Sequence, residues 1–304
     1  MRIAGMQKLT LLDYPGLTAA TVFTPGCNLR CPFCHNGELI DAADATDPSP
    51  ESSVDEVLAF LRTRHRLLDG VCISGGEPLL QPGLDDFCRA LHELGFSVKL
   101  DTNGTLPDRL RALLDAGLID HVAMDVKNMP GRYAETTGRA DIDMDPVLES
   151  MRLLLAQDPA AGGAYYEFRT TITSELHTRE DLVKLVYWIA DEARSAMSPL
   201  CPPWFIQNFK DSDTVLSGAG RLHPWNEDDL RALIPRLRVI LPTAQLRGVE
   251  ERTAVLPASA RPFSDPGALG DAERARNAHG IVEGFEVFSR RAANTNAGRP
   301  SGAK

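Results

Sequence analysis

Residues 18–34, TAATVFTPGCNLRCPFC, set the first buried strand and the loop that follows it. The β-branched and apolar residues at 18–24 predict a strand. Cys27, Cys31 and Cys34 come directly after it, at spacings of four and three. Three thiolates this close together can hold one face of a [4Fe–4S] cube, which needs four ligands. The spacing therefore predicts a cluster with one iron left open to a substrate.

Two other interpretations of the cysteines stay open at this point. A structural zinc site would take His35 as the fourth ligand, although His35 directly follows Cys34 and zinc ligands usually come as two separated pairs. An electron carrier of the ferredoxin kind would normally saturate its irons with cysteine and needs a much shorter chain. The scattered Cys72 and Cys88 are expected to be buried small apolar residues.

Beyond this loop the chain alternates β-rich runs with amphipathic helical runs, which predicts a parallel sheet with helical crossovers. Helices are indicated over 54–61, 106–117 and 182–189 by apolar residues spaced at i, i+3, i+4 and i+7 or by a closing glycine. Active sites in such folds lie at the carboxyl ends of the strands. The predicted strands are 18–24, 71–74, 96–101, 119–127, 165–172, 203–209 and 237–241.

The pattern fades after about residue 250. We predict one α/β domain over 1–248 and a partly disordered C-terminal extension over 249–304, with one ordered piece at 281–288. The N-terminus shows no signal peptide and no run of about 18 apolar residues occurs, so we expect a cytoplasmic protein. A formal charge of −10 argues against a partner held by nucleic-acid phosphates.

Charged residues fall on one face of three neighbouring predicted strands, in the pairs Lys99 and Asp101, Asp125 and Lys127, and Glu167 and Arg169. A strand buried on both faces should be almost wholly apolar, and buried charge must be paired, solvated or bound to a ligand. Either an internal salt-bridge lattice or a polar cavity explains them, and their place at the strand ends favours the cavity.

The sequence around these residues resembles that of a known family. The stretch Phe23 to Asn36 (FTPGCNLRCPFCHN) resembles the glycyl-radical-enzyme activases of the radical S-adenosylmethionine superfamily, and among them the anaerobic ribonucleoside-triphosphate reductase activating proteins. The resemblance covers about residues 1–248 and implies a partial (β/α)6 barrel. It extends to Asp13–Gly16, Gly75–Pro78, Asp101–Gly104, Met124–Lys127, Glu167–Thr171 and Gln207–Phe209.

The resemblance also implies roles for individual residues. The cluster would be held by Cys27, Cys31 and Cys34. S-adenosylmethionine would be held by Ser74, Gly75, Gly76, Glu77, Asn103 and Arg169, of which the glycine turn takes its amino group. A monovalent cation would lie among Asp101, Thr102 and Asp125. Asp13 and Lys127 would be catalytic and face an incoming protein loop. Gln207 is counted among the cofactor-binding residues and stands where the pyruvate formate-lyase activases have a histidine.

The implied function is reductive cleavage of S-adenosylmethionine to make a glycyl radical on an anaerobic ribonucleotide reductase. Its expected partners are the large subunit of that reductase and a flavodoxin- or ferredoxin-type electron donor. The alternatives are another glycyl-radical enzyme as the target, or a small-molecule substrate of the deazaguanine-synthase kind.

Overall fold

The structure is a computed structural model that describes residues 1–40 and 53–250 of the chain. Strands and helices alternate along these residues. The strands are β1 (Gly5–Thr10), β2 (Ala19–Thr24), β3 (Gly70–Gly75), β4 (Ser97–Thr102), β5 (His121–Asp125), β6 (Tyr165–Ile172), β7 (Trp204–Asn208) and β8 (Ala244–Arg247). The helices are α1 (Gly37–Ile40), α2 (Val54–Arg62), α3 (Leu84–Glu93), α4 (Pro107–Asp115), α5 (Tyr133–Thr137), α6 (Asp145–Leu155), α7 (Arg179–Ser195) and α8 (Glu227–Ile240).

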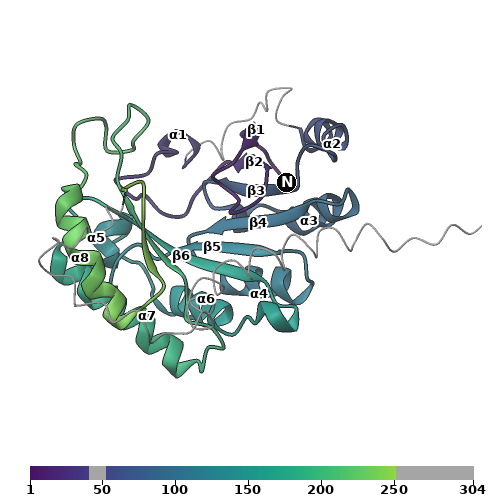
Figure 1. Cartoon of the computed structure of the whole chain (residues 1–304). Coiled ribbons are helices and arrows are strands. Elements are labelled where there is room, and N and C mark those ends of the chain that lie inside the picture. Colours follow the sequence, from purple (N-terminus) through teal and green to yellow (C-terminus); the bar gives the residue numbers. More distant parts are fainter. Residues whose placement is uncertain (41–52, 251–304) are drawn as a thin grey trace, which may run out of the picture. The chain divides into compact units, whose positions relative to one another are not determined.

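The eight strands form one sheet in sequence order, from β1 to β8. The pair β1–β2 is antiparallel, and every pair from β2–β3 to β7–β8 is parallel. Figure 1 shows β1 to β6 side by side, with the longer helices following the outer side of the sheet. Because β1 and β8 are the two ends of the order, the sheet is not closed among the described residues. The expected partial barrel is confirmed.

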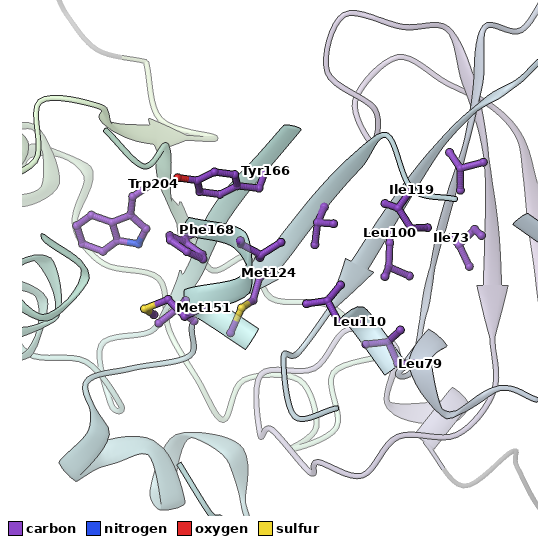
Figure 2. Close-up of a cluster of buried hydrophobic side chains, with 14 of the residues drawn as sticks. Ile73, Leu79, Leu100, Leu110, Ile119, Met124, Met151, Tyr166, Phe168 and Trp204 are labelled. Carbon is purple, nitrogen blue, oxygen red and sulfur yellow. The ribbon is translucent and has the colours of Figure 1, made fainter. Parts of the chain in front are cut away.

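The core lies between the sheet and its helices. Figure 2 shows Ile73, Leu100, Met124 and Phe168, from four successive strands, packed with Leu110 of α4. These side chains alternate along each strand with the polar ones, so the sheet separates an apolar outer layer from a polar interior. That interior forms the candidate site.

Local signals fix where the helices begin. Helix α7 starts with a capping box, in which Thr178 and Asp181 each bond the other's backbone N–H. Ser53 caps α2 in the same position, and its hydroxyl accepts from the backbone of Glu56. Helix α4 has Pro107 in its first turn, where a missing N–H costs nothing.

The strand predicted over 237–241 is wrong, because residues 227–240 form helix α8. Leu230, Leu233, Ile234 and Leu237 are buried at helical spacing, whereas Val239 is 84% exposed. The run LRVIL therefore continues a helical stripe begun before Pro235. Strands β1 and β8 were not predicted, since β1 has mostly exposed or half-buried residues and β8 has only four residues.

The expected extension over 249–304 lies outside the described residues, apart from its first two positions. Residues up to Glu250 form one compact unit. In the part of the chain that the structure describes, no helix is both long and apolar enough to cross a membrane.

Candidate active site

The cysteine loop leaves the carboxyl end of β2 and is fixed from two sides. The backbone N–H of Arg30 donates to Thr137 O (2.9 Å), and those of Leu216 and Ser217 donate to Cys34 O (2.9 Å) and Pro32 O (3.0 Å). Leu29 and Phe33 point inward and are buried with apolar residues of later segments. The loop is therefore anchored by these backbone hydrogen bonds and by its apolar side chains.

The glycine turn after β3 lies directly against this loop. Gly76 N donates to Thr24 O (2.9 Å), and Glu77 N donates to Gly26 O (2.8 Å). A Cβ on Gly76 would lie 2.0 Å from Gly26 O, so only glycine permits this approach. Gly75 has φ +114°, in the region that favours glycine. The two glycines thus bring the end of β3 to the residue before Cys27.

A cavity of about 420 Å³ opens where these turns meet. The three cysteines of the loop line it, together with groups from β1 to β7. The residues expected to hold the cluster, S-adenosylmethionine, the cation or the incoming loop all line it except Glu77: Asp13, Cys27, Cys31, Cys34, Ser74, Gly75, Gly76, Asp101, Thr102, Asn103, Asp125, Lys127, Arg169 and Gln207. Lys99 and Glu167, from the charged face of the strands, do not line it. The sequence missed Gln7, Thr21 and Ile40, which also line it. The alternation along β2 could have indicated Thr21, whereas Gln7 lies on a strand that was not predicted.

The carboxylate of Glu77 turns away from the cavity and is fully buried. Its oxygens accept from Leu79 N (3.1 Å), Thr102 Oγ1 (2.8 Å) and Asn103 N (2.7 Å). Burial raises the pKa of Glu77 to about 7, although these hydrogen bonds oppose the rise. Glu77 therefore links the turn after β3 to the turn after β4 by hydrogen bonds, without lining the cavity.

The floor of the cavity is a line of paired charges. Asp101 is bonded by Lys99, by Arg169 Nη1 (3.3 Å) and by Ser74 Oγ (3.1 Å). Asp125 is bonded by Arg169 Nε (3.0 Å) and Lys127 Nζ (2.8 Å). The ions alternate in sign across β4, β6 and β5. The lattice and the cavity that the sequence offered as alternatives are both present, because Asp101, Asp125, Lys127 and Arg169 pair with each other and line the space. Lys99 and Glu167 are paired but do not line it.

The pairing keeps these groups charged. Burial alone would raise the pKa values of Asp101 and Asp125, but the neighbouring cations outweigh it and hold both below their usual range. Burial would likewise lower the pKa of Lys127, and the charge of Asp125 outweighs it and raises that pKa. The floor is therefore ionised at neutral pH.

Asp13 and Gln207 complete the cavity from opposite sides. Asp13 lies in the bend that follows β1, and its Oδ2 accepts from Thr21 Oγ1 (2.6 Å). Gln207, on β7, is exposed. Lys127 Nζ lies 5.8 Å from the centre of the Phe33 ring and thereby approaches the cysteine loop.

Comparison with known proteins agrees with this arrangement. The sequence profile of the Radical SAM superfamily matches residues 21–158. A protein of Methanocaldococcus jannaschii, named "Putative glycyl-radical enzyme activating enzyme", is 30% identical over 232 residues, which are 76% of this chain and 89% of that one. The chain belongs to the radical SAM superfamily. It is a radical SAM enzyme, similar to proteins named as glycyl-radical-enzyme activating enzymes.

Other relatives match shorter parts of this radical SAM enzyme. The pyruvate formate-lyase-activating enzyme of Clostridium pasteurianum is 32% identical over 152 residues, 49% of this chain and 63% of that one. The crystal structure of Streptococcus suis SuiB superposes with a TM-score of 0.56 at 18% identity, over 80% of this chain and 53% of that one. The chain thus spans about half of SuiB, and this likeness concerns the fold alone.

Membership of the superfamily implies a [4Fe–4S] cluster and S-adenosylmethionine, and the donors present fit them. All three cysteines are free thiols that border one cavity. The ring of His35 is bonded to Lys210 O. Within the described residues, no three cysteine, histidine or acidic side chains gather closely enough to hold a single metal ion. Cys27, Cys31 and Cys34 would hold a [4Fe–4S] cube that lacks one protein ligand, and the cavity that they line would take S-adenosylmethionine.

Proposed function

We propose that this radical SAM enzyme generates a glycyl radical on an anaerobic ribonucleoside-triphosphate reductase. One observation carries the proposal: the three cysteines, the glycine turn and the ionised floor border a single cavity at the strand ends. The similarity of the chain to proteins named as glycyl-radical-enzyme and pyruvate formate-lyase activating enzymes supports glycyl-radical formation as the class of reaction. The choice of the reductase as the target rests on the sequence motifs Asp13–Gly16 and Met124–Lys127, which resemble those of the anaerobic ribonucleoside-triphosphate reductase activating proteins.

Each part of the cavity has a task in this proposal. The thiolates of Cys27, Cys31 and Cys34 hold the cluster. The strand edge at Ser74–Gly76 receives the amino group of S-adenosylmethionine, and Arg169 neutralises its carboxylate. When bound, the cluster and S-adenosylmethionine supply reductive cleavage of the sulfonium C–S bond, giving methionine and a 5′-deoxyadenosyl radical that can abstract hydrogen from a glycine Cα.

The target glycine must come within about 3–3.5 Å of the reacting carbon, with water excluded. We place Asp13 and Lys127 at the loop that carries this glycine, because both border the cavity and lie on different elements. The open side of the barrel gives that loop a way in. A monovalent cation between Asp101 and Asp125, and a flavodoxin- or ferredoxin-type electron donor, complete the proposal.

The chemistry is tested by 5′-deoxyadenosine formation from S-adenosylmethionine, after anaerobic reconstitution with iron and sulfide and addition of a reductant. Cys31→Ala should abolish cleavage, because it removes one of three cluster ligands. Cys88→Ala is the matched control: Cys88 is a buried thiol on α3 in the apolar core, and this variant should keep full cleavage. Full cleavage in Cys31→Ala would refute the assignment of the cluster.

The target is tested separately, with the reductase large subunit carrying α-deuterated glycine. Deuterium should appear in 5′-deoxyadenosine together with the electron paramagnetic resonance (EPR) doublet of a glycyl radical on the reductase. Pyruvate formate-lyase serves as the comparison substrate. Transfer to pyruvate formate-lyase alone, or cleavage without deuterium transfer to either protein, would contradict the proposed target.

A further inference from the structure

Asn103 joins the turn after β4 to the cysteine loop. It is 6% exposed, and its backbone N–H is held by Glu77 Oε2 at 2.7 Å. Its side chain points to the loop, where Nδ2 donates to Asn28 Oδ1 at 2.9 Å. Asn103 thus connects the turn after β4 to Asn28 of the cysteine loop, 75 residues earlier in the chain.

A closed ring of hydrogen bonds fixes which way this amide faces. Thr105 donates twice to Asn103 Oδ1, from its backbone N (3.0 Å) and its hydroxyl (2.6 Å). Asn28 Nδ2 in turn donates to Thr105 Oγ1 at 2.7 Å. Turning the Asn103 amide over would set its NH2 group against two donors. The amide nitrogen must therefore face the cysteine loop.

The amide nitrogen of Asn103 also lies within reach of a cysteine sulfur. One of its two hydrogens is taken by Asn28, and Cys27 Sγ lies 3.9 Å from Nδ2, within the longer range of hydrogen bonds to sulfur. Cys27 Sγ also accepts from Leu29 N at 3.4 Å. Cys27 thus receives two N–H donors, one from its own loop and one from the turn after β4.

We propose that Asn103 is a positioning residue that sets the reduction potential of the cluster through Cys27. A donor aimed at a ligating sulfur stabilises the reduced cluster, which carries more negative charge, and so raises its potential. The role goes beyond contact with S-adenosylmethionine and rests on the proposed cluster, but not on the identity of the glycine target.

The potential is measured by anaerobic redox titration of the reconstituted full chain, followed by EPR and without S-adenosylmethionine. Asn103→Ala should lower the ratio of reduced to oxidised cluster at a fixed potential about tenfold, which for one electron is about 59 mV. Asn103→Asp keeps an acceptor for Thr105 but loses the donor, and it should shift the potential in the same direction. Asn208→Ala is the control, because the amide of Asn208 on β7 bonds the backbone of Trp225, and its potential should equal that of the wild type.

A second readout detects the hydrogen bond itself. Exchange into D2O should give a deuteron coupled to the reduced cluster in pulsed EPR, and Asn103→Ala should lose part of this coupling. Thr105→Val keeps the Asn103 donor but removes the hydroxyl that orients it, so a smaller fall in reduction potential is expected. This variant tests the inference if Asn103→Ala assembles too little cluster to be titrated. An unmoved potential in Asn103→Asp and Thr105→Val would overturn the inference, whereas a wild-type chain that assembles no cluster would overturn the proposed function as well.

Discussion

Lys99 pairs with the cavity floor without lining the cavity, and only 1% of its side chain is exposed. Its ammonium pairs with Asp101 and lies 3.8 Å from Cys72 Sγ. Alternation along β4 indicated that Lys99 and Asp101 share a face, yet the sequence marked only Asp101 as a site residue. Which cation neutralises which carboxylate depends on the register of β4, β5 and β6, and no local pattern contains that register.

Replacing Lys99 should destabilise the protein more than replacing an exposed lysine. Lys99→Met leaves Asp101 buried with Arg169 as its remaining cation, and we expect a loss of about 2 kcal/mol in the free energy of unfolding. Lys184→Met is the control, since Lys184 pairs with Glu180 on the exposed side of α7 and the two are 53% and 74% exposed. Urea unfolding of both variants checks this, and equal losses would contradict a structural role for Lys99.

Glu77 should make stability depend on pH in the opposite sense to a salt-bridged acid. The folded protein holds its proton up to about pH 7, whereas the unfolded chain releases it near the ordinary value of 4.5. The protonated carboxyl therefore favours folding at low pH, and a contribution of about 3 kcal/mol is lost as the pH rises from 4.5 to 7.

Glu77→Gln removes this titration. The free energy of unfolding of the variant, relative to that of the wild type, should therefore be higher at about pH 8 than at about pH 5. Urea unfolding of the two proteins at these two pH values measures it. The acids Asp101 and Asp125, whose pKa values are lowered, titrate below this window and are common to both proteins. If the difference in unfolding free energy between the two proteins did not change with pH, Glu77 would not be a buried carboxyl with a raised pKa.

At the scale of elements, the sequence identified those with a strong period and missed those whose structure is set by their neighbours. The six strands β2 to β7 were predicted because each has buried residues on the core face. Residues 237–241 look like a strand taken alone and form a helix because Leu230, Leu233 and Leu237 share one stripe. Strands β1 and β8 exist through pairing with β2 and β7, which only the assembled sheet supplies.

The contact between the turn after β3 and the cysteine loop should not tolerate any side chain at Gly76. Gly76→Ala sets a Cβ 2.0 Å from Gly26 O, so backbone must move, and we expect a loss of about 3 kcal/mol together with lower iron content after reconstitution. Gly5→Ala is the control, because a Cβ there meets nothing within 4 Å. Unfolding and iron analysis of the two variants check this. Iron content equal to wild type in Gly76→Ala would show that the loop does not depend on this contact.

At the scale of the whole molecule, the question is where the folded unit ends. Residues Met1–Glu250 form one compact unit, and β8 completes its sheet. Arg247 of β8 pairs with Glu167 (3.3 Å), which is 3% exposed, and its guanidinium lies 4.3 Å from the centre of the Phe205 ring. A boundary before β8 would leave the charge of Glu167 buried without this partner, so the unit must include β8.

Two shortened chains test this boundary. A chain ending after Glu250 should unfold at the same urea concentration as the full chain and cleave S-adenosylmethionine at the same rate, because it keeps β8 and the whole cavity. A chain ending after Leu241 loses the pairing of Ala244–Arg247 with Trp204–Gln207, and it should lose about 3 kcal/mol or more. Lower stability of the longer of these chains than of the full protein would mean that residues 251–304 belong to the folded unit, and the predicted division of the chain would be wrong.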